Sequence, residues 1–489
     1  MSHMSYLGAW QTFATIGICT IAAASLLAKL VRMAILIPSM TIMDDLPNAG
    51  KERHNGLLKG RAVICGGSIA GLFSAAVCAR HFENVLIIES EGSVEELGMD
   101  VLKDKEVRVM ENGLPTAIPL RKRVVQYFSI HIFLPAITLG LRQLFPDLQK
   151  ELGYFGLSAA PMTIYNVTFL TGTVEGYLRA EDGSNTLSGV KVRSAEGVKQ
   201  QVYAGFVVDA TGPSQTSFHK WIQNSGFSPL PSSLQITYDP VLAYSQSVWN
   251  LPEKVLPQIE EIFPYGLQPG FVYANTPDWS TGEHKAMYIG FVEQSQLIIT
   301  AGGWGVTANQ RPHSIDEIRI YLKSIHQSEN TPDWIFQLLD VLAIHEEECA
   351  PWYSEIPAGN MSFIKYHQAP KGTLPDNWVA VGDAFFKLNP VYGQGCTKAV
   401  MDAITLDGLL RRLPSNSVIP SDFSGRFFHK AIARTGGMWD NTKATDYGWP
   451  TTEPAKGETL HEGAFVRNFG RYLCYAGHMV CYKAHYSYG

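Results

Sequence analysis

Charged side chains are scarce in this chain of 489 residues: Asp, Glu, Lys and Arg make up 17% of it, against about a quarter in typical globular proteins. With 39 basic and 45 acidic residues the net charge is −6, so the basic excess that nucleic-acid binding requires is lacking. Hydrophobic residues reach 46% and aromatic residues 11%, which excludes a disordered chain. This composition favours a protein that meets an apolar ligand or a membrane, and no nucleic acid.

Two further absences narrow the chemistry. The seven cysteines are odd in number and scattered, so they do not form the disulfide framework of a small secreted protein. The G-x-S-x-G motif of serine hydrolases does not occur.

Four C-terminal side chains share a regular spacing, namely Cys474, His478, Cys481 and His485. On a helix they would form one stripe, which cannot surround a tetrahedral zinc ion, so we predict no metal site.

Charge is absent altogether from the first 28 residues. Residues 6–28 are mostly apolar and long enough to cross a bilayer as a helix. Lys29 and Arg32 follow this run, an order that argues against a cleaved signal and keeps the body of the protein cytoplasmic. We predict a transmembrane or membrane-associated helix at 1–37, in the endoplasmic reticulum if the cell is eukaryotic, and a linker at 38–60. Because the run is rich in Ala, Thr and Gly, an amphipathic or buried helix is the alternative.

A strand–turn–helix–strand pattern follows the linker. The run RAVIC (61–65) is typical of a buried strand, GGSIAG (66–71) of a tight turn, and NVLIIE (84–89) of a second strand after an apolar helix. Glycines in such a turn allow helix and strand to approach, and the free N–H groups of the helix N-terminus bind phosphate. Ser68 stands where the usual fingerprint has a glycine, and Glu89 ends the second strand, where an acid binds a ribose. The pattern predicts dinucleotide binding.

Two later segments extend this pattern. The stretch FVVDATGPSQT (206–216) places a strand before a Thr-Gly turn. The stretch 377–410 contains a strand, the sequence GDA, a turn rich in Pro and Gly, and a long helical pattern. With these motifs the chain resembles the FAD-dependent monooxygenases of the para-hydroxybenzoate hydroxylase fold, which carry GGSIAGL, DATG and GDA…NPVYGQG in this order. The resemblance extends from about residue 61 to 450.

The resemblance implies roles for individual positions. The GGSIAG turn would hold the pyrophosphate of FAD, Glu89 the adenosine ribose, and Asp383 the ribityl or ribose hydroxyls. The turn at 390–395 would present backbone N–H groups to the pyrimidine edge of the flavin, while Arg121 and Gln126 match the family's flavin-contacting Arg and Gln. The cofactor-binding residues implied are Gly66, Gly67, Ser68, Gly71, Glu89, Arg121, Gln126, Asp383, Gly393 and Gly395.

The implied reaction needs FAD, NAD(P)H and O₂. In such enzymes NAD(P)H reduces FAD, a flavin C4a-hydroperoxide forms, and one oxygen atom is delivered to the substrate. Because the cofactor carries this chemistry, the sequence need not reveal a catalytic side chain, although Tyr392 and Trp304 could line the pocket. The resemblance therefore implies a monooxygenase that hydroxylates or epoxidises a hydrophobic small molecule, such as a terpenoid, polyketide or alkaloid intermediate of secondary metabolism.

Other functions stay open. Only 17 residues, 149–165, separate two predicted elements at a place where the family carries a longer excursion linked to NAD(P)H. The fold could therefore serve a non-redox cyclase or isomerase, with FAD structural or absent, or a non-catalytic flavin-binding protein. The stretch PWYSEIP (351–357) is similar to the W-x-W-x-I-P element of flavin halogenases, but Ser354 replaces the second Trp.

The predicted fold class is α/β. A Rossmann-like FAD-binding domain is interleaved with an antiparallel β-sheet substrate domain, after an N-terminal apolar helix. The FAD-binding domain is expected at 61–147 and 377–412, with the DATG strand near 206–212 returning to it, and the remainder of 148–376 is expected to be the substrate domain. Alternating patterns at 166–178, 187–194 and 284–305 predict antiparallel strands there, and 413–489 is expected to be helical.

Overall fold

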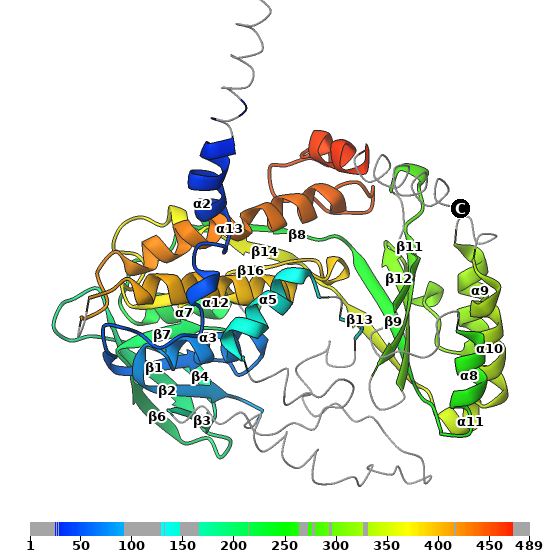
Figure 1. Ribbon diagram of the computed structural model, residues 1–489, viewed down its shortest axis with the longest axis horizontal. Coiled ribbons are helices and arrows are strands. Elements are labelled where there is room, and N and C mark those ends of the chain that lie inside the picture. The colour runs from blue at the N-terminus through cyan, green and yellow to red at the C-terminus, as the bar shows by residue number, and fades with distance from the viewer. Residues whose placement is uncertain are drawn as a thin grey trace, which may run out of the picture.

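The fold was analysed in a computed structural model, which divides into two halves (Figure 1). One half is built on a parallel sheet and the other on an antiparallel sheet. The structure describes residues 25, 27, 29–91, 129–131, 133–146, 166–213, 215–263, 272–275, 279–292, 296–325, 331–414 and 417–472.

Five parallel strands form the first sheet, in the order β15–β7–β1–β2–β3. Their apolar runs are buried, as expected for parallel strands that are covered on both faces. The strands come from widely separated parts of the chain, which confirms the predicted interleaving of parallel and antiparallel segments. They are β1 (Leu58–Cys65), β2 (Phe82–Glu89), β3 (Val167–Thr171), β7 (Phe206–Asp209) and β15 (Trp378–Ala380).

One strand prediction was wrong. The segment 166–178 was expected to form only antiparallel strands, but β3 pairs in parallel with β2, with Val85 opposite Val167. β3 is the edge strand of this sheet, and its side chains are half-buried or exposed. The next strand does turn into an antiparallel sheet, which consists of β4 (Thr173–Arg179), β5 (Leu187–Arg193) and β6 (Lys199–Tyr203).

Helices α3 (Ile69–Cys78) and α13 (Phe423–Asp446) contact strands of the parallel sheet, and α5 (Pro135–Leu144) and α12 (Gly395–Arg411) pack on the helices. Helix α12 contacts the other three and is buried along most of its length. A buried pair joins it to the βαβ unit, because His81 Nε2 lies 2.9 Å from Asp407 Oδ1 and both side chains are fully buried. Helix α7 (Gln215–Asn224) packs against β4 in the same half.

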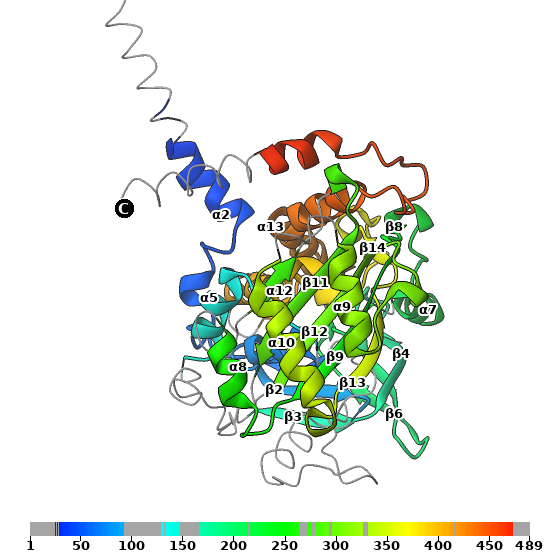
Figure 2. The ribbon, with the colours of Figure 1, turned by 90° about the vertical axis from the view of Figure 1, so that its right-hand side faces the viewer.

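The second half is a five-stranded sheet of order β10–β11–β12–β9–β13, antiparallel throughout. One face packs on α8 (Leu256–Ile262), α9 (Ile315–Ser324) and α10 (Asp333–Ile344), which lie in front of the strands in Figure 2. The short helix α11 (Glu346–Cys349) follows. The strands are β9 (Leu242–Asn250), β10 (Val272–Asn275), β11 (Lys285–Val292), β12 (Gln296–Trp304) and β13 (Trp352–Pro357).

A small third antiparallel sheet consists of three short strands. It pairs β14 (Met361–Ile364) with both β8 (Gln235–Tyr238) and β16 (Phe386–Lys387). Because β16 follows the GDA motif directly, this sheet positions the chain that leads into α12.

The N-terminal part of the described chain is helical. A π-helical turn, Arg32–Leu36, continues into α2 (Ile37–Met40), which stands out from the body in both views (Figure 1, Figure 2). Residues 1–24, most of the predicted membrane segment, lie outside the described residues. Within the part that the structure describes, no helix is both long and apolar enough to span a bilayer.

The segment that was expected to be a linker is partly packed into the body. Ile42, Leu46 and Ala49 are buried and belong to the main apolar core. Residue 60 already lies within β1. The stretch 42–49 is thus part of the packed structure, because its apolar side chains cover the ends of neighbouring helices.

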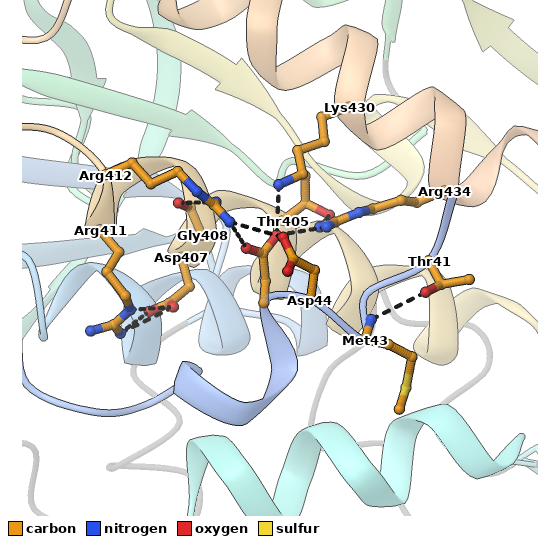
Figure 3. A network of polar contacts seen from close by, with 11 residues as sticks. Thr41, Met43, Asp44, Thr405, Asp407, Gly408, Arg411, Arg412, Lys430 and Arg434 are labelled. Carbon is orange, nitrogen blue, oxygen red and sulfur yellow. Dashed lines mark hydrogen bonds and ion pairs between the residues drawn. The ribbon is translucent and has the colours of Figure 1, made fainter. Parts of the chain in front are cut away.

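An ion-pair network fixes the same segment (Figure 3). Asp45 is buried between α12 and α13, where Arg412 donates to its Oδ1 at 2.6 Å and Lys430 to its Oδ2 at 2.9 Å. Arg434 Nη2 lies 2.6 Å from the same Oδ2. Burial raises the pKa of Asp45, but the three cations outweigh this effect and hold the pKa below its ordinary value. The carboxylate therefore clamps this segment to both helices.

Candidate functional site

Three motifs that are far apart in the sequence meet at the carboxyl ends of adjacent parallel strands. The GGSIAG turn follows β1, the DATG turn follows β7, and the GDA turn follows β15, which are neighbours in the sheet. The carboxyl ends of parallel strands, where helix N-termini gather, are the usual ligand site of open α/β sheets. The three motifs therefore lie together at one edge of the parallel sheet.

Two positions of the GGSIAG turn, Gly66 and Gly71, have room for glycine only. Gly66 has φ +108°, and a Cβ there would collide with the carbonyl of Ala210 in the DATG segment. A Cβ on Gly71 would overlap the carbonyl of Gly66. Ser68 is the N-cap of α3, yet its side chain forms no capping hydrogen bond. The turn is thus held close to β7, and the first N–H groups of α3 point to the end of the sheet.

Two acidic side chains end the strands on either side of β1. Glu89 is buried at the end of β2, where its Oε2 accepts a hydrogen bond from the Gly67 N–H at 2.7 Å and its Oε1 one from the Ser90 N–H at 2.8 Å. Asp209, at the end of β7, accepts hydrogen bonds from the Thr211 hydroxyl at 2.7 Å and the Tyr177 hydroxyl at 2.9 Å. Burial raises the pKa of Asp209. Glu89 therefore links the end of β2 to the glycine turn.

The GDA turn packs against the start of α3. Gly382 has φ +57°, and a Cβ on it would lie 2.7 Å from the Cβ of Ala70. Asp383 follows in a short 3₁₀ turn and is half-buried. Burial raises the pKa of Asp383, while the positive charges of Lys398 and Lys387 lower it. The two motifs that the sequence places more than 300 residues apart are therefore in contact.

A buried ion pair that contacts Gly382 of this turn was not predicted from the sequence. Lys398 Nζ donates to Asp402 Oδ2 at 2.7 Å and to the carbonyl of Gly382 at 2.8 Å. The Gly382 N–H donates to the same Asp402 oxygen at 3.0 Å. Both side chains are buried, so the pair satisfies both backbone groups of the glycine. The i, i+4 spacing of Lys and Asp on α12 was a visible signal, but an exposed helical pair has the same spacing.

The predicted flavin-facing turn leads directly into α12. Pro390–Tyr392 form a 3₁₀ turn, Gly393 adopts φ +63°, and α12 begins at Gly395. A Cβ on Gly395 would meet nothing within 4 Å. The turn therefore places the open N-terminus of a 17-residue helix beside the GDA motif.

A second residue that the sequence did not predict, Asp446, forms hydrogen bonds with Asn389 and Tyr392 of this turn. It is fully buried at the last position of α13. Burial raises the pKa of Asp446 to about 7, although four hydrogen bonds act in the opposite direction. The donors are Tyr238 (2.8 Å), Asn389 (2.9 Å), Trp304 (3.0 Å) and Tyr392 (3.0 Å). No spacing rule could have identified this cluster, because its members come from four different elements.

The antiparallel sheet has a second face, opposite to α8–α10. The register aligns Tyr288, Thr300 and Gln246 in one row across β11, β12 and β9. Among the described residues, the buried Tyr288 hydroxyl and Thr300 Oγ1 have no hydrogen-bond partner. Tyr288 also raises the pKa of Tyr392 through its charge, after the larger effects of burial and Asp446. This sheet face therefore carries a polar row next to the turn at 390–395.

Trp304 connects the sheet to the turn. It ends β12, and its ring centroid lies 6.5 Å from that of Tyr392 and 3.8 Å from that of Trp449, on which it stacks. Trp304 is almost fully buried and Tyr392 is half-buried. The two aromatic residues that were predicted to line the pocket are thus neighbours, with Tyr392 the more accessible of the two.

Several predictions fall on residues that the structure does not describe. Arg121, Gln126, the connection 149–165 and the C-terminal Cys and His residues all lie outside the described ranges. Over the described ranges, no group of three or more His, Cys, Asp or Glu side chains is arranged to hold a metal ion. The halogenase-like stretch forms the edge strand β13, with Trp352 exposed.

No protein-family profile matches the chain, and no curated protein matches it. Among solved structures, PqsL, described as a probable FAD-dependent monooxygenase from Pseudomonas aeruginosa, is 13% identical; the match covers 84% of this chain and all of PqsL, with a TM-score of 0.48. The flavin-dependent brominase Bmp2 is 12% identical over 80% of this chain and 87% of its own, with a TM-score of 0.42. The flavin-dependent halogenase CmlS is 13% identical over 80% and 65%, with a TM-score of 0.44. Since these scores lie below 0.5, we base the function on the geometry of this chain.

Proposed function

We propose that this protein is a flavoprotein oxidoreductase that binds FAD across the carboxyl ends of β15, β7, β1 and β2, and that it acts as an NAD(P)H- and O₂-dependent monooxygenase. The convergence of the GGSIAG, DATG and GDA turns on adjacent strands supports the FAD site most strongly. In an open α/β sheet, such an arrangement of turns and helix N-termini suits a dinucleotide.

The residues present fit the chemistry of FAD. A pyrophosphate needs backbone N–H donors, which the first turn of α3 offers after Gly66, Gly67, Ser68 and Gly71. Ribose and ribityl hydroxyls need acceptors, for which the carboxylates of Glu89 and Asp383 are suitable. Gly393 and Gly395 would leave space for the flavin ring at the N-terminus of α12. Arg121 and Gln126 remain proposed flavin contacts on the resemblance alone.

When bound, FAD supplies hydride acceptance and oxygen activation, which no amino-acid side chain provides. The chain's own residues would bind the cofactor, orient the substrate and exclude water from both. The N-terminus of α12 stabilises negative charge beside it, because its first N–H groups are not paired within the helix. Tyr392 and Trp304 place apolar ring surface between this helix and the antiparallel sheet, where a dry pocket favours oxygen transfer over side reactions.

The proposed substrate is a hydrophobic small molecule, such as a terpenoid, polyketide or alkaloid intermediate, that is hydroxylated or epoxidised. The composition supports this choice, since aromatic residues make up 11% of the chain and charged residues 17%. The hydroxyls of Tyr288 and Thr300 add hydrogen-bonding groups to this sheet face. We expect a substrate that carries an oxygen function on an apolar skeleton.

Attachment to a membrane through residues 1–37, with the body on the cytoplasmic side, is a separate proposal. The uncharged run 1–28 and the cations Lys29 and Arg32 support it. Exposed Leu27, Leu30 and Met33 in the described part of the same segment are consistent with it. Cell fractionation of the full chain tests the proposal: recovery with membranes is expected, and recovery only in the soluble fraction would contradict it.

A spectroscopic experiment tests the monooxygenase. The purified full chain should carry an oxidised flavin spectrum that bleaches with NADPH under anaerobic conditions. On admission of air, the flavin should reoxidise, with oxygen uptake that couples to product when a suitable terpenoid or polyketide is present. Product formation without flavin would instead favour a cyclase or isomerase, and flavin that neither NADH nor NADPH reduces would contradict a monooxygenase.

A further inference from the structure

The buried carboxylate of Asp446 has an unusual environment. It lies at the C-terminus of the 24-residue helix α13, where the helix dipole disfavours a negative charge. Within the described part of the chain, no Lys or Arg forms an ion pair with it, and its hydrogen-bonding partners are neutral. Burial without a countercharge is costly, so the arrangement calls for a purpose other than stability.

The partners of Asp446 belong to separate parts of the fold. Oδ2 accepts from the hydroxyl of Tyr238 on β8, while Oδ1 accepts from the indole of Trp304 at the end of β12. The two other donors, Asn389 and Tyr392, flank the turn that leads into α12. One carboxylate thus ties the small sheet, the large antiparallel sheet and the turn together.

The contact with Asn389 sets the geometry of the turn. The Asn389 amide donates to Asp446 at 2.9 Å, which leaves its carbonyl oxygen to accept from the Val391 N–H at 3.1 Å. This second bond caps the turn at its first residues. Asn389 is fully buried, so no water competes for either bond. The orientation of the amide, and with it the cap, follows from the acceptor that Asp446 provides.

We propose that Asp446 is the positioning residue of the 389–395 turn: by accepting from Asn389 and Tyr392, it holds the entrance to α12 against the antiparallel sheet. The inference rests on the proposed function in one respect, that this turn faces the flavin. The charged and titratable groups around the carboxylate are the phenols of Tyr238 and Tyr392 and, next in the chain, Tyr447, whose ring lies edge-on to Tyr238. All have raised pKa values because they are buried, so they are neutral donors.

Amide hydrogen exchange of the apoprotein tests the position of the turn without any cofactor. In Asp446→Leu the side chain keeps its approximate size but offers no oxygen atom to the four hydrogen-bond donors. We expect exchange in a peptide that spans 389–395 to be at least tenfold faster than in wild type, while a peptide from β1 is unchanged. Asp440→Asn, an exposed position on the same helix, is the matched control and should exchange like wild type.

Tyr392→Phe is the second variant, since it removes a single phenolic oxygen and keeps the ring. It decides the question if Asp446→Leu does not fold. Faster exchange of the turn in Tyr392→Phe, by a smaller factor, supports the proposal. Wild-type exchange rates in either variant that folds would overturn it.

FAD affinity, measured by flavin fluorescence, separates this inference from the proposed function. If the turn loosens and FAD dissociates at least tenfold more readily from Asp446→Leu than from Asp440→Asn, both proposals are supported. If the turn loosens but wild type does not bind FAD, the positioning role holds and the FAD site is refuted. If wild type binds FAD but the turn exchanges at the same rate in all variants, the positioning role is refuted alone.

Discussion

Lys398 and Asp402, one turn apart on α12, form a buried ion pair at 2.7 Å that also takes up both backbone groups of Gly382. The ammonium group of Lys398 lies 4.0 Å from the ring centroid of Phe386, so it is further stabilised by a cation–π contact. Burial alone would make each charge unfavourable. Together the two side chains fix the GDA turn from the side of the helix, and with it the position of Asp383.

Removing one partner of this pair should destabilise the fold. In Lys398→Met the carboxylate of Asp402 is left buried without its countercharge, and we expect a loss of about 3–5 kcal/mol in the free energy of unfolding. The double variant Lys398→Met/Asp402→Leu removes both charges and should recover part of that loss, but not the part that comes from the unpaired backbone groups of Gly382. FAD affinity should be low in both the single and the double variant, because the Gly382 carbonyl loses its Lys398 partner in both. Equal stability of single and double variants, measured by urea unfolding, would contradict this role.

Gly395→Ala probes the space in front of α12. The added methyl group meets nothing within 4 Å in the protein, so stability should change by less than about 1 kcal/mol. If the flavin occupies that space, FAD affinity should fall at least tenfold. Gly437→Ala, an open glycine position on α13, is the matched control and should bind FAD like wild type. Unchanged affinity in Gly395→Ala would remove this position from the cofactor site.

Gly408 allows the closest approach between α12 and the 42–49 segment. A Cβ at this position would collide with the carboxylate of Asp45. We expect Gly408→Ala to lower the free energy of unfolding by about 1–3 kcal/mol, because overpacking forces Asp45 away from Arg412 and Lys430. Gly437→Ala should instead be neutral or stabilise by up to about 1 kcal/mol, since alanine favours an exposed helix. Thermal unfolding of both variants gives the comparison; a stabilising Gly408→Ala would show that this segment is not tightly packed.

The raised pKa of Asp446 predicts a pH dependence of stability. In the folded protein its pKa is about 7, against 3.8 for the ordinary side chain, so between these pH values the folded state retains a proton that the unfolded state has lost. The stability that this group contributes is therefore complete below about pH 4 and decreases as the pH rises to about 7.

The difference between wild type and Asp446→Asn measures this contribution. From pH 5 to pH 8 the free energy of unfolding of wild type should fall, relative to the variant, by on the order of 2 kcal/mol. Asp440→Asn should follow wild type at every pH. A constant difference between wild type and Asp446→Asn would show that Asp446 does not titrate in this range.

Local patterns in the sequence were sufficient to predict the strands and the helix that carry the motifs. The buried run before Gly66, the strand before DATG and the long helix after Gly395 all form where their periodicity predicts them. That the three turns meet could also be predicted, because they belong to one recognisable order of motifs. In the structure, Gly382 of the third motif lies against Ala70 of the first, as that order of motifs predicts.

Tertiary contacts decided what the sequence could not. The strand β3 has an alternating pattern like its neighbour β4, and only its pairing with β2 makes it part of the parallel sheet. Asp446 gives no sequence signal, because its donors at positions 238, 304, 389 and 392 lie up to about 200 residues away in the chain. Likewise, the burial of Ile42 and Asp45 depends on α12 and α13, which follow hundreds of residues later.

Titration of the apoprotein with FAD tests the central claim most directly, with wild type compared to Asp383→Ala and to Asp440→Ala. We predict that wild type and Asp440→Ala bind one FAD per chain, whereas Asp383→Ala binds at least tenfold more weakly and remains folded, because its side chain is only half-buried. Equal FAD binding by all three proteins, or none by wild type, would contradict a flavin site at the ends of the parallel strands.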